Sequence, residues 1–280
     1  MPNLSTARSF LFAPASDERK LAKALDAGAD AVIADLEDAV VAAEKERARG
    51  VATSLLREPR ADVLRLVRVN AVGTPWFADD LAAARELELD GIVLPKATPD
   101  AAPALAGLGA PVVAIVETAA GVRLAYELAV VPEVACLMLG AVDLGLELGL
   151  EPRPDGLELL YARSSLVVAS AAAALRAPLD QVWVDVRDGE GLRRDCALGR
   201  SLGFRGKACV HPAQVPVVNE AYAPSQEELG RAQEVVEAYE RAAAEGAGAV
   251  ALDGEMIDLP VVERARQLLA EAKRGVLHAE

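Results

Sequence analysis

The stretch AVIADLEDAV (residues 31–40) begins as an apolar strand and then places three carboxylates within four positions. Its first four residues, Ala-Val-Ile-Ala, are typical of a strand that is buried on both faces. Because successive side chains of a strand point to opposite faces, Asp35 and Glu37 share one face, while Leu36 and Asp38 share the other. We expect Asp35, one residue deeper, to be a structural acid inside the fold. We expect Glu37 and Asp38 to reach the end of the strand.

Apolar runs of this kind recur about every 25 residues, and each is followed by a polar cluster and an amphipathic segment. This alternation predicts parallel strands joined by helices, and eight units over about 210 residues predict a closed (β/α)8 TIM barrel. A doubly wound open sheet is the structural alternative, which the lack of a GxGxxG motif after the first run weakens. The runs are SFLFAPA (9–15), AVIADLED (31–38), VLRLVRVN (63–70), GIVLPK (91–96), PVVAIVET (111–118), ACLMLGAVD (135–143), DQVWVDVRD (180–188) and RGKACVHP (205–212).

The chain after the eighth unit predicts an appended C-terminal helical segment. We expect the barrel to occupy residues 1–220 and this segment to occupy residues 221–280. Within it, EGAGAVALDGE (245–255) predicts a flexible linker. The following MIDLPVVERARQLLAEAKR (256–274) predicts a short helix outside the eight units.

Bulk composition argues against several classes of function. Of 280 residues, 52% are hydrophobic and 26% are charged, and the net charge of −14 disfavours nucleic acids and anionic membranes as partners. No apolar run approaches the roughly 18 residues of a membrane span, and the first ten residues lack the layout of a signal peptide. The three cysteines are far apart and form no CxxC pair, which is typical of free thiols in a reducing compartment, so we expect a cytoplasmic protein.

Polar and charged residues end nearly every predicted strand. The C-terminal ends of the strands in a (β/α)8 barrel meet at one rim, where such folds carry their active sites. The sequence therefore predicts functional groups from seven strands at one rim, although strand ends are also simply where polar residues begin. In chain order they are Glu37 and Asp38, Arg68 and Asn70, Lys96, Glu117 and Thr118, Asp143, Asp185 and Asp188, and Lys207 and His211.

Glu117 and Asp143 end neighbouring predicted strands, where two carboxylates in a low-dielectric pocket repel each other strongly. A divalent cation removes this repulsion, and oxygen ligands with room for water suit Mg²⁺. The alternative is that both residues cap the helices that follow them. Neither His211 nor His278 forms an HxxH or HExxH pair, which argues against a zinc site.

Two basic residues of the rim suggest different chemistries. Arg68 points into the barrel mouth on the alternation of RLVRVN (65–70), where it binds a substrate carboxylate or enolate oxygen, or else pairs internally with Glu37. Lys96 either forms a Schiff base with a keto acid, as in a class I aldolase, or makes a structural ion pair. The glycine-rich, basic stretch ALGRSLGFRGK (197–207) is a candidate for meeting phosphates, but it does not match a P-loop.

An ordered set of motifs resembles the citrate lyase beta-subunit family, within the wider HpcH/HpaI aldolase superfamily of barrel lyases. The motifs occur in the family's order and cover nearly the whole chain. They are RSFLFAPA (8–15), GADAVIADLEDAV (28–40), VRVN (67–70), LPK (94–96), VETAAG (116–121), LGAVDLGLELG (139–149), GFRGKACVHPAQV (203–215), NEAYAPS (219–225) and GEMIDLP (254–260).

The resemblance implies a Mg²⁺-dependent carbon–carbon lyase that cleaves a 3-hydroxyacyl-CoA thioester into a keto acid and an acyl-CoA. The implied substrates are citryl-CoA, malyl-CoA and citramalyl-CoA. Cleavage of citryl-CoA gives oxaloacetate and acetyl-CoA. By the same resemblance, Glu117 and Asp143 match the metal ligands, and Arg68 matches the arginine at the substrate oxygens. Glu37 and Asp38 match the acidic pair behind the metal and its waters.

The resemblance also implies roles for one backbone loop and for one further aspartate. The backbone of Gly140, Ala141 and Val142 matches the loop that cradles the keto-acid carboxylate. Asp258 in MIDLP matches an acid–base aspartate that stand-alone members carry over the site of a neighbouring subunit. These members assemble as trimers or multiples of three, so a homotrimer or hexamer is expected, with residues 221–280 as the lid.

Two departures from the family pattern bear on the ligand. The first loop usually reads Pro-Gly and then carries an arginine, and Arg19 is the matching candidate CoA contact. Here the loop is APASDER (13–19) with Ala15 in the glycine position, a departure that counts against this contact. Val142 stands where an acidic residue is common, which alters the carboxylate pocket.

We therefore predict a lyase whose partners are an acyl-CoA thioester and a keto acid. Lys96 is expected to bind the substrate, and Lys207 and His211 are expected to bind CoA. Thioester hydrolysis, as by a malyl-CoA thioesterase, and condensation of the malate synthase type are alternatives within the same family. A class I aldolase and a non-catalytic acyl-CoA-binding or scaffold subunit are alternatives of other classes.

Overall fold

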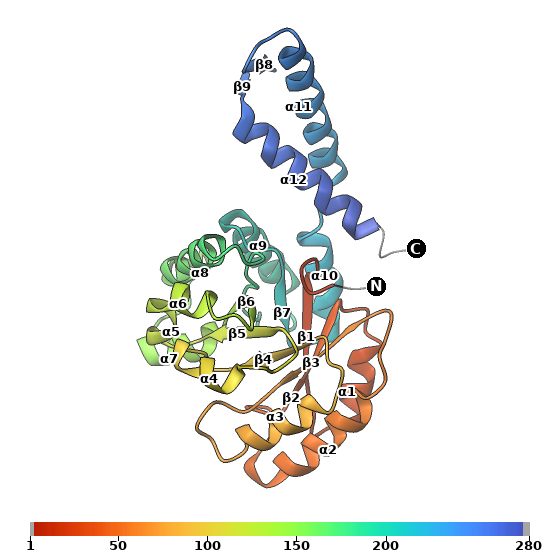
Figure 1. Ribbon diagram of the computed structural model, residues 1–280, viewed down its shortest axis with the longest axis vertical. Helices are drawn as coiled ribbons and strands as arrows, with labels where there is room; N and C mark the ends of the chain where they lie inside the picture. Colours follow the sequence, from red (N-terminus) through yellow and green to blue (C-terminus); the bar gives the residue numbers. More distant parts are fainter. Residues whose placement is uncertain (1–2, 277–280) are drawn as a thin grey trace. The chain divides into compact units, whose positions relative to one another are not determined.

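The computed structural model describes residues 3–276 and divides the chain into two compact units, Met1–Tyr222 and Ala223–Glu280. The first unit is a parallel barrel surrounded by helices, and the second is a pair of helices connected through a hairpin (Figure 1). Each unit has a hydrophobic core of its own. Within residues 3–276, no helix combines the length and the apolar character that crossing a bilayer requires.

The strands of the first unit form one parallel sheet that curls into a barrel of eight positions. Seven positions are regular strands in the order β6-β5-β4-β3-β2-β1-β7. The eighth is held by Leu179 and Asp180, which bridge to Met138 of β6 and Lys207 of β7 and so close the (β/α)8 barrel that the sequence predicts. The strands are β1 (Ser9–Pro14), β2 (Ala31–Asp35), β3 (Leu64–Arg68), β4 (Gly91–Leu94), β5 (Val112–Val116), β6 (Val134–Leu139) and β7 (Lys207–Cys209).

The seventh predicted strand, DQVWVDVRD (180–188), is much shorter than its alternating pattern suggests. Only Leu179 and Asp180 pair with neighbouring backbone, while Val184 and Val186 lie in irregular chain with exposed side chains. The reason is the lack of a partner, because the adjacent β7 has only three residues. A longer strand at this position would leave its backbone groups without hydrogen bonds.

Helices follow the strands and cover the outside of the barrel (Figure 1). They are α1 (Glu18–Leu25), α2 (Lys45–Leu55), α3 (Phe77–Arg85), α4 (Ala102–Leu105), α5 (Ala119–Arg123), α6 (Ala125–Ala129), α7 (Ala141–Leu148), α8 (Leu160–Ala172), α9 (Gly189–Leu202) and α10 (Val215–Ala221). Helix α1 illustrates the pattern, since Asp17 caps its N-terminus and Leu21, Ala24 and Leu25 form its buried face. Four 3-10 turns, η1 (Ala42–Glu44), η2 (Pro99–Ala101), η3 (Leu157–Leu159) and η4 (Pro212–Gln214), complete the connections.

Alternation along the strands separates two apolar layers. One set of side chains packs between strands and helices, and the other, which includes Ile33, Leu66 and Ile115, fills the barrel interior. Two residues further along the same inward-facing series come Asp35, Arg68 and Glu117. The interior therefore changes from apolar to charged at the carboxyl ends of the strands.

Four charged residues, which we call the closing cluster, lie buried where the barrel closes: Arg163, Asp180, Asp195 and Lys207. Arg163 donates to both Asp180 oxygens at 3.0 and 2.9 Å, and to Asp195 at 2.6 Å. Lys207 Nζ pairs with Asp195 and lies 3.4 Å from Asp180. These bonds tie α8, α9 and β7 to the short seventh position. Lys207 is fully buried in them, so its placement does not support the CoA contact expected from the sequence.

The second unit consists of α11 (Gln226–Ala244), the antiparallel strands β8 (Val250–Leu252) and β9 (Glu255–Ile257), and α12 (Leu259–Val276). The expected flexible linker at residues 245–255 is instead mostly hairpin. Its turn is Asp253-Gly254, and both residues have positive φ, which is the geometry that suits a two-residue hairpin loop. The expected C-terminal helix is present and is long, because Val262 and Ala265 pack with Ala232 and Val235 of α11.

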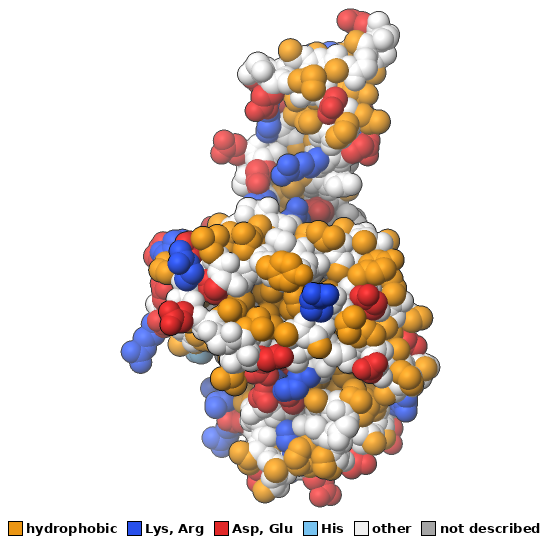
Figure 2. Space-filling view, turned by 90° about the vertical axis from the view of Figure 1, so that its left-hand side faces the viewer, with side chains coloured by type: hydrophobic (Ala, Val, Ile, Leu, Met, Phe, Trp, Pro, Cys, Tyr) orange, Lys and Arg blue, Asp and Glu red, His pale blue; other side chains and the backbone are white. Residues whose placement is uncertain are grey.

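Both signs of charge are exposed on the molecular surface. On the face drawn in Figure 2, acidic and basic side chains are interspersed with apolar ones. Among the exposed apolar side chains of the barrel are Val142, Leu146 and Tyr161.

Candidate active site

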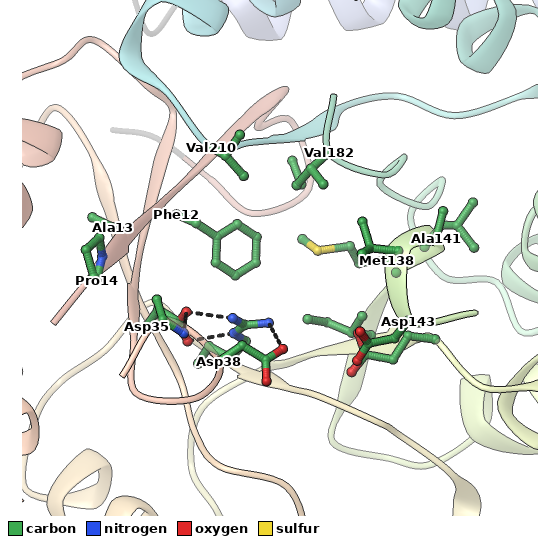
Figure 3. Close-up of a pocket in the computed structure, with 18 residues that line it drawn as sticks. Phe12, Ala13, Pro14, Asp35, Asp38, Met138, Ala141, Asp143, Val182 and Val210 are labelled. Atoms are coloured by element: carbon green, nitrogen blue, oxygen red, sulfur yellow. Dashed lines mark hydrogen bonds and ion pairs between the residues drawn. The ribbon is translucent and has the colours of Figure 1, made fainter. Parts of the chain in front are cut away.

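A cavity of about 430 Å³ lies at the carboxyl ends of the barrel strands. Its apolar and acidic linings occupy opposite sides (Figure 3). The apolar side includes Phe12, Met138, Val182 and Val210, and the acidic side includes Asp35, Asp38 and Asp143. Arg68 and Glu117 also line the cavity, so residues from β2, β3, β5 and β6 converge there as the strand-end pattern predicts.

Arg68, the last residue of β3, is held by Asp35, the last residue of β2. Its Nε and Nη2 donate to the two Asp35 oxygens at 2.7 and 2.6 Å, which is the bidentate fork geometry. Its Nη1 lies 3.1 Å from Glu37 Oε2, and its guanidinium lies 5.0 Å from the ring centroid of Phe12. The guanidinium is therefore oriented by protein contacts while it lines the cavity. Asp35 is the closer partner, and the ion pair with Glu37 is present as well.

The acidic pair Glu37 and Asp38 is divided by burial. Glu37 is 6% exposed, and burial raises its pKa while the charge of Arg68 opposes that shift. The Asp38 side chain is 60% exposed, lines the cavity and lies 3.9 Å from Arg68 Nη1. A ligand would thus meet Asp38 directly, whereas Glu37 acts through the two cations that it contacts.

Lys96 lies between the ends of three strands. Its Nζ donates to Glu37 Oε1 at 2.6 Å and lies 3.4 Å from Asp143 Oδ2. Burial alone would lower the pKa of the Lys96 ammonium, but the hydrogen bond to Glu37 and the nearby carboxylates raise it. Because a Schiff-base lysine reacts as the neutral amine, this setting disfavours the class I aldolase alternative.

Glu117 and Asp143 reach the cavity from neighbouring strands. Glu117 follows β5 and is 5% exposed, whereas Asp143 lies in the first turn of α7 with a side chain that is 35% exposed. Burial raises the pKa of Glu117 to about 7, and the hydrogen bond from the Lys96 amide partly opposes that shift. The Glu117 carboxyl therefore loses its proton near neutral pH, and a nearby cation would stabilise the resulting carboxylate.

Gly140 permits the close approach of Glu117 to the end of β6. A Cβ atom at position 140 would lie 2.5 Å from the Glu117 Cβ and 2.8 Å from a methyl carbon of Ile115. Helix α7 begins directly afterwards, and Ala141 and Val142 line the cavity with Gly140. The first amides of a helix lack intrahelical acceptors, so this segment can bind an anionic group such as a carboxylate.

The chemistry of these donors fits magnesium. Glu117 and Asp143 offer hard oxygen atoms at the cavity, and Mg²⁺ in proteins commonly uses one or two carboxylates and keeps several waters. No group of three or more His, Cys, Asp or Glu side chains in the described part of the chain is placed to hold a metal ion. Water and substrate oxygens would therefore complete the coordination of an ion bound by these two residues.

Two basic residues expected to bind CoA are exposed near the strand ends. Arg19 lies in the first turn of α1 and lines a separate open hollow with Lys20 and Arg47. His211 follows β7 and caps η4, where its Nδ1 accepts a hydrogen bond from the Ala213 amide at 3.1 Å. Both positions are accessible to a ligand, in contrast to Lys207.

Asp258 belongs to the second unit. It directly precedes α12, and its Oδ1 accepts a hydrogen bond from the Val261 amide at 3.4 Å. Its neighbours Met256 and Leu259 are exposed apolar residues, with exposed fractions of 70% and 52%.

The structure adds contributors that the sequence argument did not assign. Asp35 orients Arg68, and Phe12 packs against the guanidinium. Buried Lys45 donates to the backbone oxygens of Leu36 and Glu37 at 2.7 and 2.8 Å, which fixes the chain that presents the acidic pair. The alternation from Ile33 to Asp35 indicated that Asp35 faces the barrel interior, but no sequence pattern pointed to Lys45.

The fold is that of a TIM-barrel enzyme, and a family model described as a C–C bond lyase of the TIM-barrel fold matches residues 162–274. The chain belongs to the HpcH/HpaI aldolase/citrate lyase family, whose model matches residues 8–212.

Two relatives and one solved structure match nearly the whole chain. A citrate lyase subunit beta-like protein of Deinococcus radiodurans is 40% identical over 94% of this chain and 96% of its own length. A (3S)-malyl-CoA thioesterase of Cereibacter sphaeroides is 39% identical over 95% of this chain and 94% of its own. The crystal structure of CitE from Mycobacterium tuberculosis in complex with magnesium, acetoacetate and coenzyme A covers 96% of this chain and 100% of its own, with 36% identity and a TM-score of 0.84.

Proposed function

We propose that this protein is a Mg²⁺-dependent carbon–carbon lyase that cleaves citryl-CoA, a 3-hydroxyacyl-CoA thioester, into oxaloacetate and acetyl-CoA. The observation that carries the proposal is the meeting of Glu117, Asp143 and Arg68 at one cavity. The likeness to a citrate lyase beta-like protein and to a CitE structure that holds magnesium and coenzyme A supports it. Malyl-CoA and citramalyl-CoA lyase activities are the alternatives within this reaction class.

Glu117 and Asp143 would hold the ion, while Glu37 orients Arg68 and Lys96 beside them. Bound magnesium would supply a Lewis acid that polarises the hydroxyl and carboxylate oxygens of the substrate. Arg68, fixed by Asp35, presents its guanidinium to the oxygen of the thioester carbonyl, where negative charge develops as the C–C bond breaks. The amides that begin α7 bind the carboxylate of the keto-acid portion.

A carboxylate must move the proton between the substrate hydroxyl and the acyl-CoA carbon. We assign this role to Asp258 of a neighbouring copy, delivered by the second unit as a lid in a homotrimer or hexamer. Asp38 is the alternative within the barrel, because its carboxylate is exposed at the cavity. Mixing Asp258→Asn subunits with Arg68→Lys subunits tests the assignment. Restored turnover in the mixture would support delivery between subunits, and its absence would favour Asp38.

The proposed function is tested by incubating the protein and Mg²⁺ with citryl-CoA, malyl-CoA and citramalyl-CoA and identifying the keto acid released. Oxaloacetate from citryl-CoA, lost on addition of EDTA, is the expected result. Release of no keto acid from any of the three thioesters would contradict the lyase assignment.

A thioesterase is the second candidate function, favoured by the 39% identity to a (3S)-malyl-CoA thioesterase. Hydrolysis would release free CoA and the hydroxy acid, with no keto acid. Measuring both free thiol and keto acid in the same reaction separates the two functions. The reverse condensation, as in malate synthase chemistry, is tested by adding the acyl-CoA and keto acid together. Borohydride reduction in the presence of keto acid should trap no adduct on Lys96.

A further inference from the structure

Lys96 has a backbone conformation that is rare for its residue type. Its φ is +49°, in the left-handed region, and among the described residues only Ala174 and Asp253 share a positive φ without being glycine. A side chain in this region is strained, so it persists where surrounding contacts determine it, and such sites often serve function. The contacts here come from β5, since the Ala97 amide also donates to the Ile115 oxygen at 3.0 Å.

The strained conformation directs the Lys96 amide at the candidate metal ligand. That amide donates to Glu117 Oε1 at 2.7 Å, which fixes one oxygen of the buried carboxylate. Glu117 is further confined by the absence of a side chain at Gly140. Its orientation therefore depends on the backbone of Lys96.

The other end of the same residue meets two more carboxylates. The ammonium donates to Glu37 at 2.6 Å and lies 3.4 Å from Asp143. Lys96, which follows β4, thus contacts acids that follow three other strands, β2, β5 and β6. The side chain is 40% exposed, so the ammonium can move without opening the core.

The charges of this region do not balance. Four carboxylates, Asp35, Glu37, Asp38 and Asp143, form ion pairs with only two cations of the described chain, Arg68 and Lys96. The fifth carboxylate, Glu117, accepts the Lys96 amide. Arg68 is committed to Asp35 and Glu37 by the shortest of its contacts. Lys96 therefore supplies the positive charge beside Asp143.

We propose that Lys96 is a positioning residue that acts through both ends: its left-handed amide orients Glu117 for a divalent cation, and its ammonium serves as a built-in counter-ion that holds Glu37 and Asp143. The inference rests on the proposed function and deepens it. Removing the ammonium leaves the carboxylates with more uncompensated charge, so Mg²⁺ binds more tightly although Glu37 loses its position and turnover falls.

The ammonium is tested by isothermal titration of the full chain with MgCl2 in the absence of substrate. Lys96→Met should bind Mg²⁺ about tenfold more tightly than the unchanged protein, since a unit charge a few ångströms away is removed. Lys96→Arg should bind with nearly unchanged affinity. Lys23→Met, the same substitution on an exposed position of α1, serves as the matched control. Unchanged or weaker binding by Lys96→Met would overturn the counter-ion role.

The backbone is tested by comparing Lys96→Gly with Lys96→Ala in thermal unfolding. Glycine adopts positive φ without strain, so Lys96→Gly should melt at a higher temperature than Lys96→Ala, the reverse of the usual order of these residues. A lower melting temperature for Lys96→Gly would contradict the role assigned to the strained amide.

Failure of the inference and failure of the proposed function give different results. If the protein releases keto acid but Lys96→Met does not gain Mg²⁺ affinity, the inference alone is wrong. If no thioester yields a keto acid while the Mg²⁺ and unfolding results are as expected, the lyase assignment is wrong and the positioning role of Lys96 stands.

Discussion

Two clusters of charged residues in the barrel contain similar side chains but differ in charge balance and in exposure. The closing cluster pairs Arg163 and Lys207 with Asp180 and Asp195, so its charges balance, and none of the four is more than 8% exposed. The rim cluster, by contrast, holds Asp35, Glu37, Asp38, Glu117 and Asp143 against Arg68 and Lys96, and it opens to the cavity.

Charge balance distinguishes the structural cluster from the functional one. In the closing cluster each charge has its partner, and the bonds substitute for the strand that the seventh position lacks. In the rim cluster the excess of carboxylates at a solvent-accessible cavity is the property that a divalent cation satisfies. Changing one cluster at a time tests this difference.

Breaking the closing cluster should have the largest effect on folding. Lys207→Met leaves two buried carboxylates with one cation, so the free energy of unfolding should fall by about 3–5 kcal/mol. Guanidinium titration of the full chain measures this change. Lys23→Met on exposed α1 should stay within about 0.5 kcal/mol of the unchanged protein. Normal stability with lost CoA binding would instead revive the ligand role expected from the sequence.

Changing the cation of the rim should mainly affect catalysis. Arg68→Lys keeps a positive charge but loses the fork that binds Asp35, so the charge no longer faces the developing oxyanion in a fixed orientation. We expect kcat to fall by about 10²–10³-fold. The Mg²⁺ affinity should change much less, because Arg68 is not a ligand of the ion in the proposed site. Near-normal turnover would contradict the role of Arg68.

The rim should also impose a pH dependence on stability. Burial raises the pKa of Glu117 from 4.5 to about 7, so the folded protein keeps a proton that the unfolded chain releases between those values. Stability without metal should therefore fall by about 1–3 kcal/mol as the pH rises from 4.5 to 7. Over the same window Mg²⁺ binding should strengthen, because the ion needs the carboxylate form.

Denaturant unfolding at pH 5 and pH 7.5 measures this dependence. Glu117→Gln should flatten the stability difference and weaken Mg²⁺ binding, whereas Glu58→Gln at an exposed position should retain the original profile. An unchanged slope in Glu117→Gln would assign the titration to another group.

A matched pair of glycine substitutions should give the smallest and most selective effects. Gly140→Ala forces a Cβ against Glu117 in the rim, and Gly199→Ala forces one to 2.6 Å from an Asp180 oxygen in the closing cluster. Each should cost about 1–3 kcal/mol of stability. Only Gly140→Ala should also weaken Mg²⁺ binding, which titration with MgCl2 would show. Equal metal affinity in the two variants would mean that Glu117 adapts.

Much of this architecture could be predicted from the order of apolar runs and strand-end residues. The barrel and the convergence of Arg68, Glu117 and Asp143 follow from the parallel arrangement, which brings strand ends to one rim. The placement of Lys207 did not follow, because the sequence shows a lysine beside an apolar run but not that the fold brings Asp180 and Asp195 around it. The hairpin at residues 250–257 was missed because glycine and alanine around it resemble a linker, although Asp253-Gly254 is a turn signal.

The (β/α)8 fold and the set of carboxylates could be predicted from the chain alone, because they depend on local periodicity and on residue type at strand ends. The family could be recognised from the order of its motifs. Which of these charges balance one another became clear only in the folded molecule. Asp35 pairs with Arg68, Glu37 pairs with Arg68 and Lys96, and Lys207 pairs with Asp195. Such pairing depends on distances between residues far apart in the chain and on burial, which strengthens the interaction of charges. The three acids of AVIADLEDAV are visible in the sequence, but their different roles depend on the residues that the barrel places next to each of them.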